Sequence, residues 1–272
     1  MAQLPFKIVA VDMDGTFMSD QQTFDHAWFD QILTDLRANG AHFIISSGRP
    51  IKKIQVDFSE YLDRISIVAE NGGLIYRDNQ LLRQRSLTAS TGRKLVAYIA
   101  EKFPEVGIFV SGTEGSYIRS SESEEFIKFM TFYYPERKLL DTLEQMPSDE
   151  RIIKLTLRCP EELGPQIEAG FNEISSEKVH TASSGYHTVD VIPEGVNKAD
   201  GIKFFLDYFK CSSADLIAFG DDFNDLEMLQ LAKYSYLMAN GNPKLVPYAK
   251  FRAPSNNENG VLQVLAEYLK QK

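Results

Sequence analysis

The chain has 272 residues, of which 43% are hydrophobic and 25% are charged. This composition is typical of a globular protein and excludes a disordered chain, and at ~100 to 200 residues per domain the length allows one large domain or two modest ones. The 29 Lys and Arg residues are outnumbered by 38 Asp and Glu, for a net charge of −9 with no Lys/Arg-rich block, so we expect no nucleic-acid or membrane partner.

The first residues, Met1 to Pro5, lead towards a strand without a basic segment or a long apolar stretch. No later segment has ~18 consecutive apolar residues, so we expect a cytoplasmic protein. The two cysteines, Cys159 and Cys211, have no Cys or His at metal-ligand spacing, which indicates idle thiols. We expect a monomer or a weak homo-oligomer.

The first predicted strand, Ile8 to Ala10, runs into Val11-Asp12-Met13-Asp14-Gly15-Thr16. Ligands of parallel sheets bind at the carboxyl ends of the strands, so the two carboxylates are expected at a crevice. Two like charges so close favour a bound Mg²⁺, an acid/base role, or both. An ordinary Asp and Gly turn is the alternative.

The next two units repeat this plan. Apolar residues at helical spacing predict a helix over 24–38, and the strand 43–45 follows it and runs into Ser47-Gly48. A helix over 51–62 and a strand over 65–69 come next, ending at Asn71-Gly72. Polar turns therefore follow three predicted strands.

The pattern then changes to a hairpin, 74–76 with 80–82, and to mixed short elements. Within residues 84–187 we expect an α+β insertion with helices over 88–102 and 161–174 and strands over 107–110, 116–119 and 152–157. The α/β pattern returns with a strand over 189–192, a helix over 198–209, a strand over 216–219 and a helix from Leu226. The predicted domains are a discontinuous core, 1–83 and 188–272, and an inserted domain, 84–187.

Five polar groups of the core now fall at strand ends or helix starts: Asp12 with Asp14, Ser47-Gly48, Asn71-Gly72, Lys198, and Asp221 with Asn224 and Asp225. Each one alone is more often a turn residue, a helix cap or a solvated charge. Together they supply what phosphoryl transfer requires: a nucleophile, an acid, cation ligands, a lysine and hydrogen-bond donors.

These residues resemble the haloacid dehalogenase (HAD) superfamily of phosphohydrolases, in its Cof-type branch with a type IIB cap. The resemblance spans essentially the whole chain. Four motifs occur in the family's order: 12–16, 47–49, 195–198 and 220–225, with 238–242 and 256–261 as softer matches. The resemblance implies a Rossmann-like three-layer α/β/α core with a mostly parallel sheet, plus an α+β cap that determines substrate specificity. Ser47 departs from the family, where Thr is more usual.

The resemblance also implies a mechanism. Asp12 would attack phosphorus and form an aspartyl phosphate, and Asp14 would protonate the leaving group and then activate water. Mg²⁺ would be held by the Asp12 and Asp221 carboxylates and the Asp14 carbonyl, with Asp222 and Asp225 around these ligands. Lys198 would offset charge on the nucleophile and the phosphoryl group. The remaining phosphate-binding groups would come from Met13, Ser47, Gly48, Asn71 and Asn224.

We therefore expect a Mg²⁺-dependent phosphatase for small phosphorylated metabolites such as sugar phosphates. A sugar phosphomutase, which returns the phosphoryl group to a sugar, is one alternative. A non-catalytic phosphate-sensing module, similar to a receiver domain, is the other. Against the sensor stand the second carboxylate, Asp14, and the insertion of ~100 residues, because a receiver needs neither a leaving-group acid nor a cap.

Overall fold

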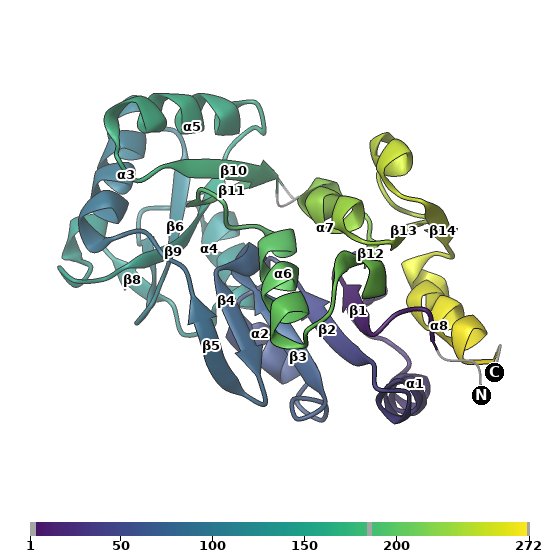
Figure 1. Ribbon diagram of the computed structural model, residues 1–272. Helices are drawn as coiled ribbons and strands as arrows, with labels where there is room; N and C mark the ends of the chain where they lie inside the picture. Colours follow the sequence, from purple (N-terminus) through teal and green to yellow (C-terminus); the bar gives the residue numbers. More distant parts are fainter. Residues whose placement is uncertain (1–3, 184–186, 271–272) are drawn as a thin grey trace. The chain divides into compact units, whose positions relative to one another are not determined.

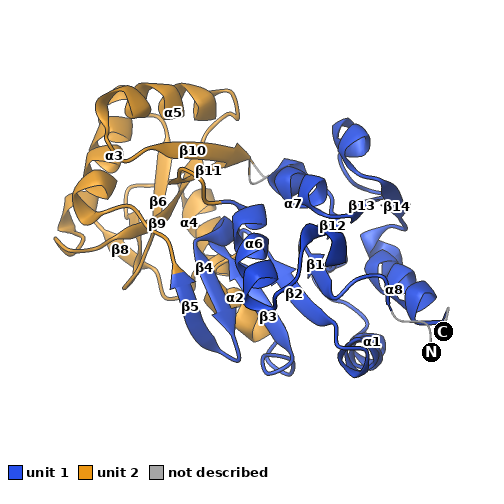
Figure 2. Ribbon diagram, viewed as in Figure 1, with its two compact units in different colours: residues 1–48, 58–83, 197–272 blue, residues 49–57, 84–196 orange. Residues whose placement is uncertain are grey.

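The computed structural model describes residues 4–183 and 187–270. They form two compact units (Figure 2). Unit 1 comprises residues 1–48, 58–83 and 197–272, and unit 2 comprises residues 49–57 and 84–196. The chain thus passes from unit 1 to unit 2 and back twice.

Unit 1 is built on an eight-stranded sheet with the order β14-β13-β12-β1-β2-β3-β4-β5. The six strands from β14 to β3 are parallel, and β4 runs antiparallel to β3. Its parallel strands are short apolar runs, as expected where helices cover both faces of a sheet. The strands are β1 (Ile8–Val11), β2 (His42–Ser46), β3 (Ile65–Ala69), β4 (Leu74–Arg77), β5 (Gln80–Gln84), β12 (Leu216–Gly220), β13 (Tyr234–Met238) and β14 (Phe251–Ala253).

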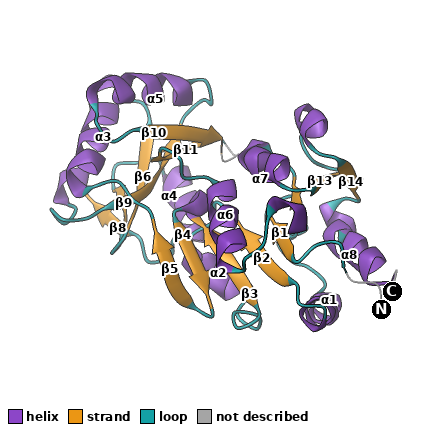
Figure 3. Cartoon of the chain, in the orientation of Figure 1, coloured by secondary structure: helices purple, strands orange, loops and turns teal. Residues whose placement is uncertain are grey.

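Helices lie on both faces of this sheet (Figures 1 and 3). On one face Ile8, Ala10 and Ile44 pack against Phe205 and Met228. On the other, the ring of Phe29 packs edge-on against Phe43, with centroids 5.0 Å apart. The helices of unit 1 are α1 (His26–Ala38), α6 (Lys198–Tyr208), α7 (Leu226–Leu231) and α8 (Gly260–Lys270), with 3₁₀ turns η1 (Glu70–Gly72), η3 (Ser213–Asp215), η4 (Phe223–Asp225), η5 (Pro243–Tyr248) and η6 (Asn256–Glu258).

The position of β1 explains where a ligand would bind in unit 1. β1 pairs with β2 on one side and with β12 on the other, so the strand order reverses there. In open α/β sheets such a switch point leaves a crevice outside the carboxyl ends of the strands. The residues that follow β1 and β12 are Asp12 and Asp221.

Unit 2 contains a six-stranded sheet with the order β10-β11-β9-β6-β7-β8, antiparallel except for the β7–β8 pair. One face packs on α3 and α5 through residues such as Leu95 and Phe171, and the other packs on α4 through Phe126. Its elements are α2 (Ile51–Asp57), α3 (Ala89–Lys102), β6 (Gly107–Gly112), β7 (Ser116–Arg119), α4 (Glu124–Tyr133), β8 (Lys138–Leu140), η2 (Leu143–Gln145), β9 (Ile152–Arg158), α5 (Leu163–Ile174), β10 (Val179–Ser183) and β11 (Thr188–Pro193).

Two elements differ from the sequence prediction. The strand expected to begin the returning core, 189–192, is β11, which pairs with β9 and β10 in the sheet of unit 2. The helix predicted over 51–62 ends at Asp57, because the chain leaves unit 2 there and buries Phe58 and Tyr61 in unit 1. Within unit 2, Arg49 and Lys53 lie over the rings of Tyr133 and Phe132.

The α/β fold class with an inserted α+β unit is as the sequence predicts. Among the described helices, none combines the length and apolar character that crossing a membrane requires.

Candidate active site

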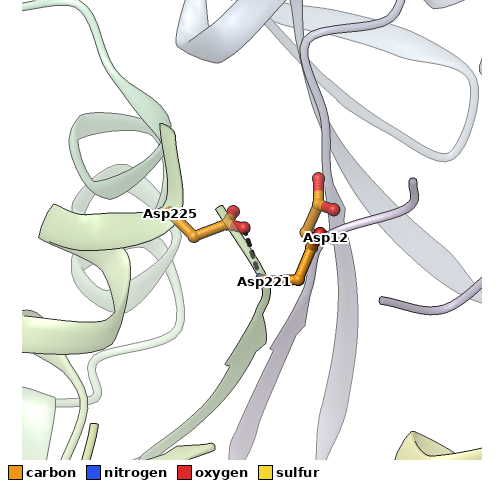
Figure 4. Close-up of side chains that lie close together, drawn as sticks. All are labelled: Asp12, Asp221 and Asp225. Atoms are coloured by element: carbon orange, nitrogen blue, oxygen red, sulfur yellow. Dashed lines mark hydrogen bonds between the residues drawn. The ribbon is translucent and has the colours of Figure 1, made fainter. Parts of the chain in front are cut away.

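Three carboxylates of unit 1 come together although the first is more than 200 residues away from the other two in the sequence. Asp12, Asp221 and Asp225 each have a carboxylate oxygen within 4.8 Å of the others (Figure 4). Asp12 follows β1 and Asp221 follows β12, and the parallel register Val11↔Phe219 aligns the two strand ends. Asp225 belongs to η4, the 3₁₀ turn that leads into α7.

Lys198 joins two of these carboxylates. Its Nζ donates to Oδ1 of Asp12 at 2.5 Å and to Oδ1 of Asp225 at 2.7 Å, and its side chain is fully buried. Lys198 is the first residue of α6, and the preceding Asn197 caps the helix by accepting a hydrogen bond from the backbone N–H of Asp200. The cap fixes the start of the helix, and with it the position of the ammonium group.

Asp225 also shapes the turn after β12. Its Oδ2 accepts the backbone N–H groups of Asp221 at 2.9 Å and of Asp222 at 3.3 Å. The bond to Asp221 is the dashed line in Figure 4. Both carboxylate oxygens of Asp225 are engaged, one by Lys198 and the other by these backbone N–H groups. Asp225 therefore helps to position Asp221 and Lys198.

The electrostatics of the cluster are dominated by burial and by an excess of negative charge. Burial raises the pKa of Asp12 well above its usual range, and Asp225, Asp221 and Asp14 add to the effect. Burial, followed by the charge of Asp225, raises the pKa of Asp221 to about 7. Burial alone would lower the pKa of Lys198, but Asp12 and Asp225 outweigh it and raise that pKa. The charge of Lys198, which pairs with Asp12 and Asp225, thus offsets only part of the negative charge of the three carboxylates.

Asp14 and Met13 lie on the turn after β1. The carbonyl of Met13 accepts the N–H groups of Phe17 at 3.0 Å and Met18 at 2.8 Å, which closes the turn. Asp14 is half-buried, and its Oδ1 accepts from Nε2 of Gln22 at 3.3 Å. Met13 is fully buried.

The predicted phosphate-binding residues Ser47, Gly48 and Asn71 follow β2 and β3. The N–H of Ser47 donates to the carbonyl of Val68, and the N–H of Asn71 donates to the carbonyl of Ser47. A Cβ on Gly48 would lie 3.0 Å from Oδ1 of Asn71, so a side chain there would press on Asn71. The structure therefore groups these three residues with one another.

The last two predicted residues surround Asp221. Asp222 caps η4, and its Oδ1 accepts from Nδ2 of Asn242 at 3.1 Å. Asn224 is half-buried in the same turn. Thr16 lies in the predicted motif 12–16 but is not among the predicted site residues, and its hydroxyl donates to Oδ1 of Asp221 at 2.8 Å. The position of Thr16 directly after Asp14 and Gly15 was the sequence feature that could have indicated a role in the site.

A family model described as haloacid dehalogenase-like hydrolase matches residues 9–265. The match covers almost the whole chain, and the buried Asp12 lies within it. The chain belongs to the haloacid dehalogenase-like hydrolases. The superfamily and the phosphatase type of enzyme that the sequence indicates are confirmed by this match and by the relatives described next.

Among its relatives, the chain is similar to 5-amino-6-(5-phospho-D-ribitylamino)uracil phosphatase YbjI of Escherichia coli, with 30% identity over 98% of this chain and 97% of that protein. It is 26% identical to the Bacillus subtilis phosphatase YitU, which carries the same activity in its name, over 96% and 97% of the two chains. The crystal structure of SMU.1108c from Streptococcus mutans superposes with a TM-score of 0.92 at 33% identity, covering 97% of this chain and 99% of that one.

Proposed function

We propose that this HAD-family hydrolase is a Mg²⁺-dependent phosphatase that cleaves phosphomonoesters of small metabolites through a phosphorylated Asp12. The observation that carries the proposal is the buried Asp12 carboxylate at the end of β1, hydrogen-bonded to Lys198 and beside Asp221. A buried carboxylate held by a lysine is oriented for attack, and its proximity to further carboxylates favours a cation.

The residues of the cluster suit Mg²⁺. Hard divalent cations take oxygen ligands, and the cluster offers carboxylate oxygens only. Lys198 neutralises one charge among three carboxylates, so a divalent cation would relieve the repulsion that, in addition to burial, raises the pKa of Asp12 and Asp221. In the proposal the ion is held by the carboxylates of Asp12 and Asp221 and the carbonyl of Asp14. When bound, it would supply charge stabilisation for the phosphoryl oxygens.

In the first step, an oxygen of Asp12 attacks phosphorus and forms an O–P bond while the bond from phosphorus to the leaving oxygen breaks. Asp14 gives its proton to that oxygen. In the second step, Asp14 takes a proton from water, which attacks the aspartyl phosphate and releases inorganic phosphate. Lys198 holds Asp12 throughout and offsets the charge that develops on the phosphoryl oxygens.

Further groups are proposed to bind the phosphoryl oxygens: the hydroxyl of Ser47, the amides of Gly48 and Met13, and the side chains of Asn71 and Asn224. The close approach of Asn71 to Gly48 supports this assignment, because it places the Asn71 side chain beside the backbone of Gly48. Asp225 is proposed to orient Asp221 and Lys198, which its hydrogen bonds support. Asp222 is proposed to support the same turn, where it accepts a hydrogen bond from Asn242.

The proposed substrates are phosphorylated sugars and sugar alcohols. Two relatives are named for 5-amino-6-(5-phospho-D-ribitylamino)uracil, a phosphorylated ribityl compound, which makes that compound the first substrate to test. We propose that residues 84–187, the predicted cap, select the organic part of the substrate. A cytoplasmic location and a monomeric or weakly associating state remain predictions.

The deciding experiment combines a substrate screen with a trapping assay. Purified protein is offered sugar phosphates, the ribityl compound and p-nitrophenyl phosphate with Mg²⁺ or with EDTA, and kcat/KM is measured for each. We expect hydrolysis only with Mg²⁺ and none by Asp12→Asn. A dependence on sugar bisphosphate with transfer to a second sugar would indicate the phosphomutase. Stable phosphorylation without turnover would indicate the phosphate sensor.

A further inference from the structure

The turn that carries Asp14 runs from Asp14 to Met18, and its own backbone bonds converge on the carbonyl of Met13, which accepts the N–H groups of Phe17 and Met18. Asp14 and Met18 form an isolated β-bridge across the turn. The hydroxyl of Thr16 donates to Asp221 in the middle of the turn. The direction of the Asp14 side chain therefore depends on these bonds and on how the Gly15 and Met18 ends of the turn are held.

Two asparagines from the C-terminal part of unit 1 hold those ends. Nδ2 of Asn240 donates to the carbonyl of Gly15 at 2.7 Å, and Nδ2 of Asn256 donates to the carbonyl of Met18 at 3.0 Å. The backbone N–H of Asn256 donates to Oδ1 of Asn240 at 3.0 Å, which joins the two. We call this pair the asparagine clamp. It is more than 220 residues away from the turn in the sequence.

The clamp rests on rigid neighbours. Asn240 follows β13, and the next residues are fixed because the N–H of Asn242 donates to the carbonyl of Asp221 at 2.7 Å. Asn256 begins η6, which Ser255 and Glu258 close with a reciprocal capping box. Asn256 is 2% exposed, whereas Asn240 is exposed. The clamp is therefore positioned by the fold before any substrate arrives.

A second set of bonds ties the chain after the turn to the same loop. Both oxygens of Asp20 accept side-chain amides, Oδ1 from Asn256 at 3.1 Å and Oδ2 from Asn257 at 2.9 Å. These bonds lower the pKa of Asp20, with Asn257 the larger contributor, so Asp20 stays ionised and remains an acceptor. The turn is held at both ends and just beyond.

We propose that Asn240 and Asn256 are positioning residues for Asp14, and that the clamp holds this carboxyl where it can protonate the leaving oxygen. The inference rests on the proposed function, in which Asp14 is the general acid. An error of about 1 Å in the placement of a reacting group can cost about 100-fold in rate, so a few hydrogen bonds in this turn are sufficient to control the step.

A positioning role for the asparagine clamp should make the rate depend on the leaving group of the substrate, which a merely structural role would not. A sugar alkoxide is a poor leaving group and requires the proton from Asp14 as its bond to phosphorus breaks. A p-nitrophenolate leaves as a stable anion and needs little help. General acid catalysis contributes about 10²–10⁴-fold to this first step, so loss of positioning should slow the first step selectively for alkyl phosphates. Hydrolysis of the aspartyl phosphate, the second step, is the same for both substrates.

The experiment compares the two classes of substrate in four variants: Asn240→Ala, Asn240→Asp, Asn256→Ala and, as control, Asn39→Ala. Asn240→Asp keeps the acceptor for Asn256 and removes the donor to Gly15. Asn39 also donates a side-chain amide to a backbone carbonyl, that of Asp35 at 2.6 Å, but at the end of α1. Saturating Mg²⁺ is used, and the rate of leaving-group release in the first turnover, KM and Tm are measured with a sugar phosphate that wild type hydrolyses and with p-nitrophenyl phosphate. The first turnover is measured because the second step, in which Asp14 activates water, is the same for both substrates.

We expect each clamp variant to lose about 10- to 100-fold in the first-turnover rate of leaving-group release from the sugar phosphate and less than about threefold in that rate from p-nitrophenyl phosphate, with Asn39→Ala unchanged. Asp14→Asn should show the same selectivity, and adding Asn240→Ala to it should cause no further loss. Equal losses on both substrates, or none, would overturn the inference. If the buried Asn256 variant does not fold, the test relies on the exposed Asn240 variants, for which the loss on the sugar phosphate is compared with the loss on p-nitrophenyl phosphate. A wild-type protein that hydrolyses neither substrate overturns the proposed function instead.

Discussion

Nζ of Lys198 lies 2.5 Å from Oδ1 of Asp12, although 186 residues separate the two in the sequence. Both side chains are buried, and the same ammonium group reaches Asp225. A buried ion pair of this kind contributes little net stability when intact, but removing one partner leaves a charge unpaired. The geometry therefore serves the orientation of Asp12 more than the stability of the fold.

Replacing Lys198 should affect both activity and stability. In Lys198→Met we expect kcat to fall by about 10²–10³-fold, because the charge that faces the nucleophile is lost. We expect the free energy of unfolding to fall by about 3–5 kcal/mol, because Asp12 and Asp225 stay buried without their partner. Steady-state kinetics and urea unfolding measure the two effects. Lys203→Met, on the exposed face of the same helix, is the control. Wild-type kcat in Lys198→Met would contradict the role given to this lysine.

Mg²⁺ binding should be visible without any substrate. A ligand that binds only the folded state at 100 times its Kd adds about 2.7 kcal/mol of stability, so Mg²⁺ should raise the Tm of the wild-type protein. Asp221→Asn should lose most of this rise, because one of the proposed ligands is neutralised. Asp207→Asn, on the exposed surface of α6, should keep it. An equal rise in Asp221→Asn and wild type would remove Asp221 from the ligand set.

His42 should make the protein less stable in mild acid. Its ring stacks on Phe209 with centroids 3.7 Å apart. Burial lowers the pKa of His42, and the charges of Arg77 and Arg37 act in the same direction. The unfolded chain then binds a proton more readily than the folded one, so the free energy of unfolding falls as the pH drops through about 6.5, the ordinary histidine value, until the folded pKa is passed.

The check is urea unfolding at pH 7.5, 6.5 and 5.5 for wild type and for His42→Phe. The variant keeps an aromatic ring over Phe209 but cannot be protonated. We expect the difference in stability between the two proteins to shift in favour of His42→Phe at the lower pH values. A difference that is constant with pH would show that His42 does not contribute to the acid sensitivity.

The sequence was sufficient to predict most elements of the core because short apolar runs followed by polar turns are a local pattern. β3, for example, spans Ile65–Ala69 as predicted. The helix predicted over 51–62 was too long because Phe58 and Tyr61 continue its apolar spacing, yet they are buried in unit 1. The spacing of apolar residues indicates that a residue is buried, but it does not indicate which part of the protein that residue packs against.

Contacts between segments that are distant in the sequence also limited the prediction of the sheets and of the site. β11 has the apolar composition of a core strand, and only its hydrogen bonds to β9 and β10 place it in the other sheet. Within the site, the motifs indicated Asp12, Asp221 and Lys198, but nothing local pointed to the contact of Asn240 with Gly15 or of Asn256 with Met18. Asparagines in loops are common turn residues, so their sequence gives no sign of a distant acceptor.

Gly15 offers a test of how closely the Asp14 turn fits against Asp221. Gly15 has φ +73°, and a Cβ there would lie 2.3 Å from Oδ2 of Asp221. Gly40 has nearly the same φ, +70°, with nothing within 4 Å of its would-be Cβ. Both Gly→Ala variants should therefore lose about 1 kcal/mol or more of stability from backbone strain. Only Gly15→Ala should also displace the Asp221 carboxylate, so we expect it alone to lose at least about 100-fold in kcat and to lose the Mg²⁺-dependent rise in Tm. Kinetics and thermal unfolding on the matched pair separate the two effects: if Gly40→Ala lost activity to the same degree, strain in the backbone rather than the position of Asp221 would be the cause.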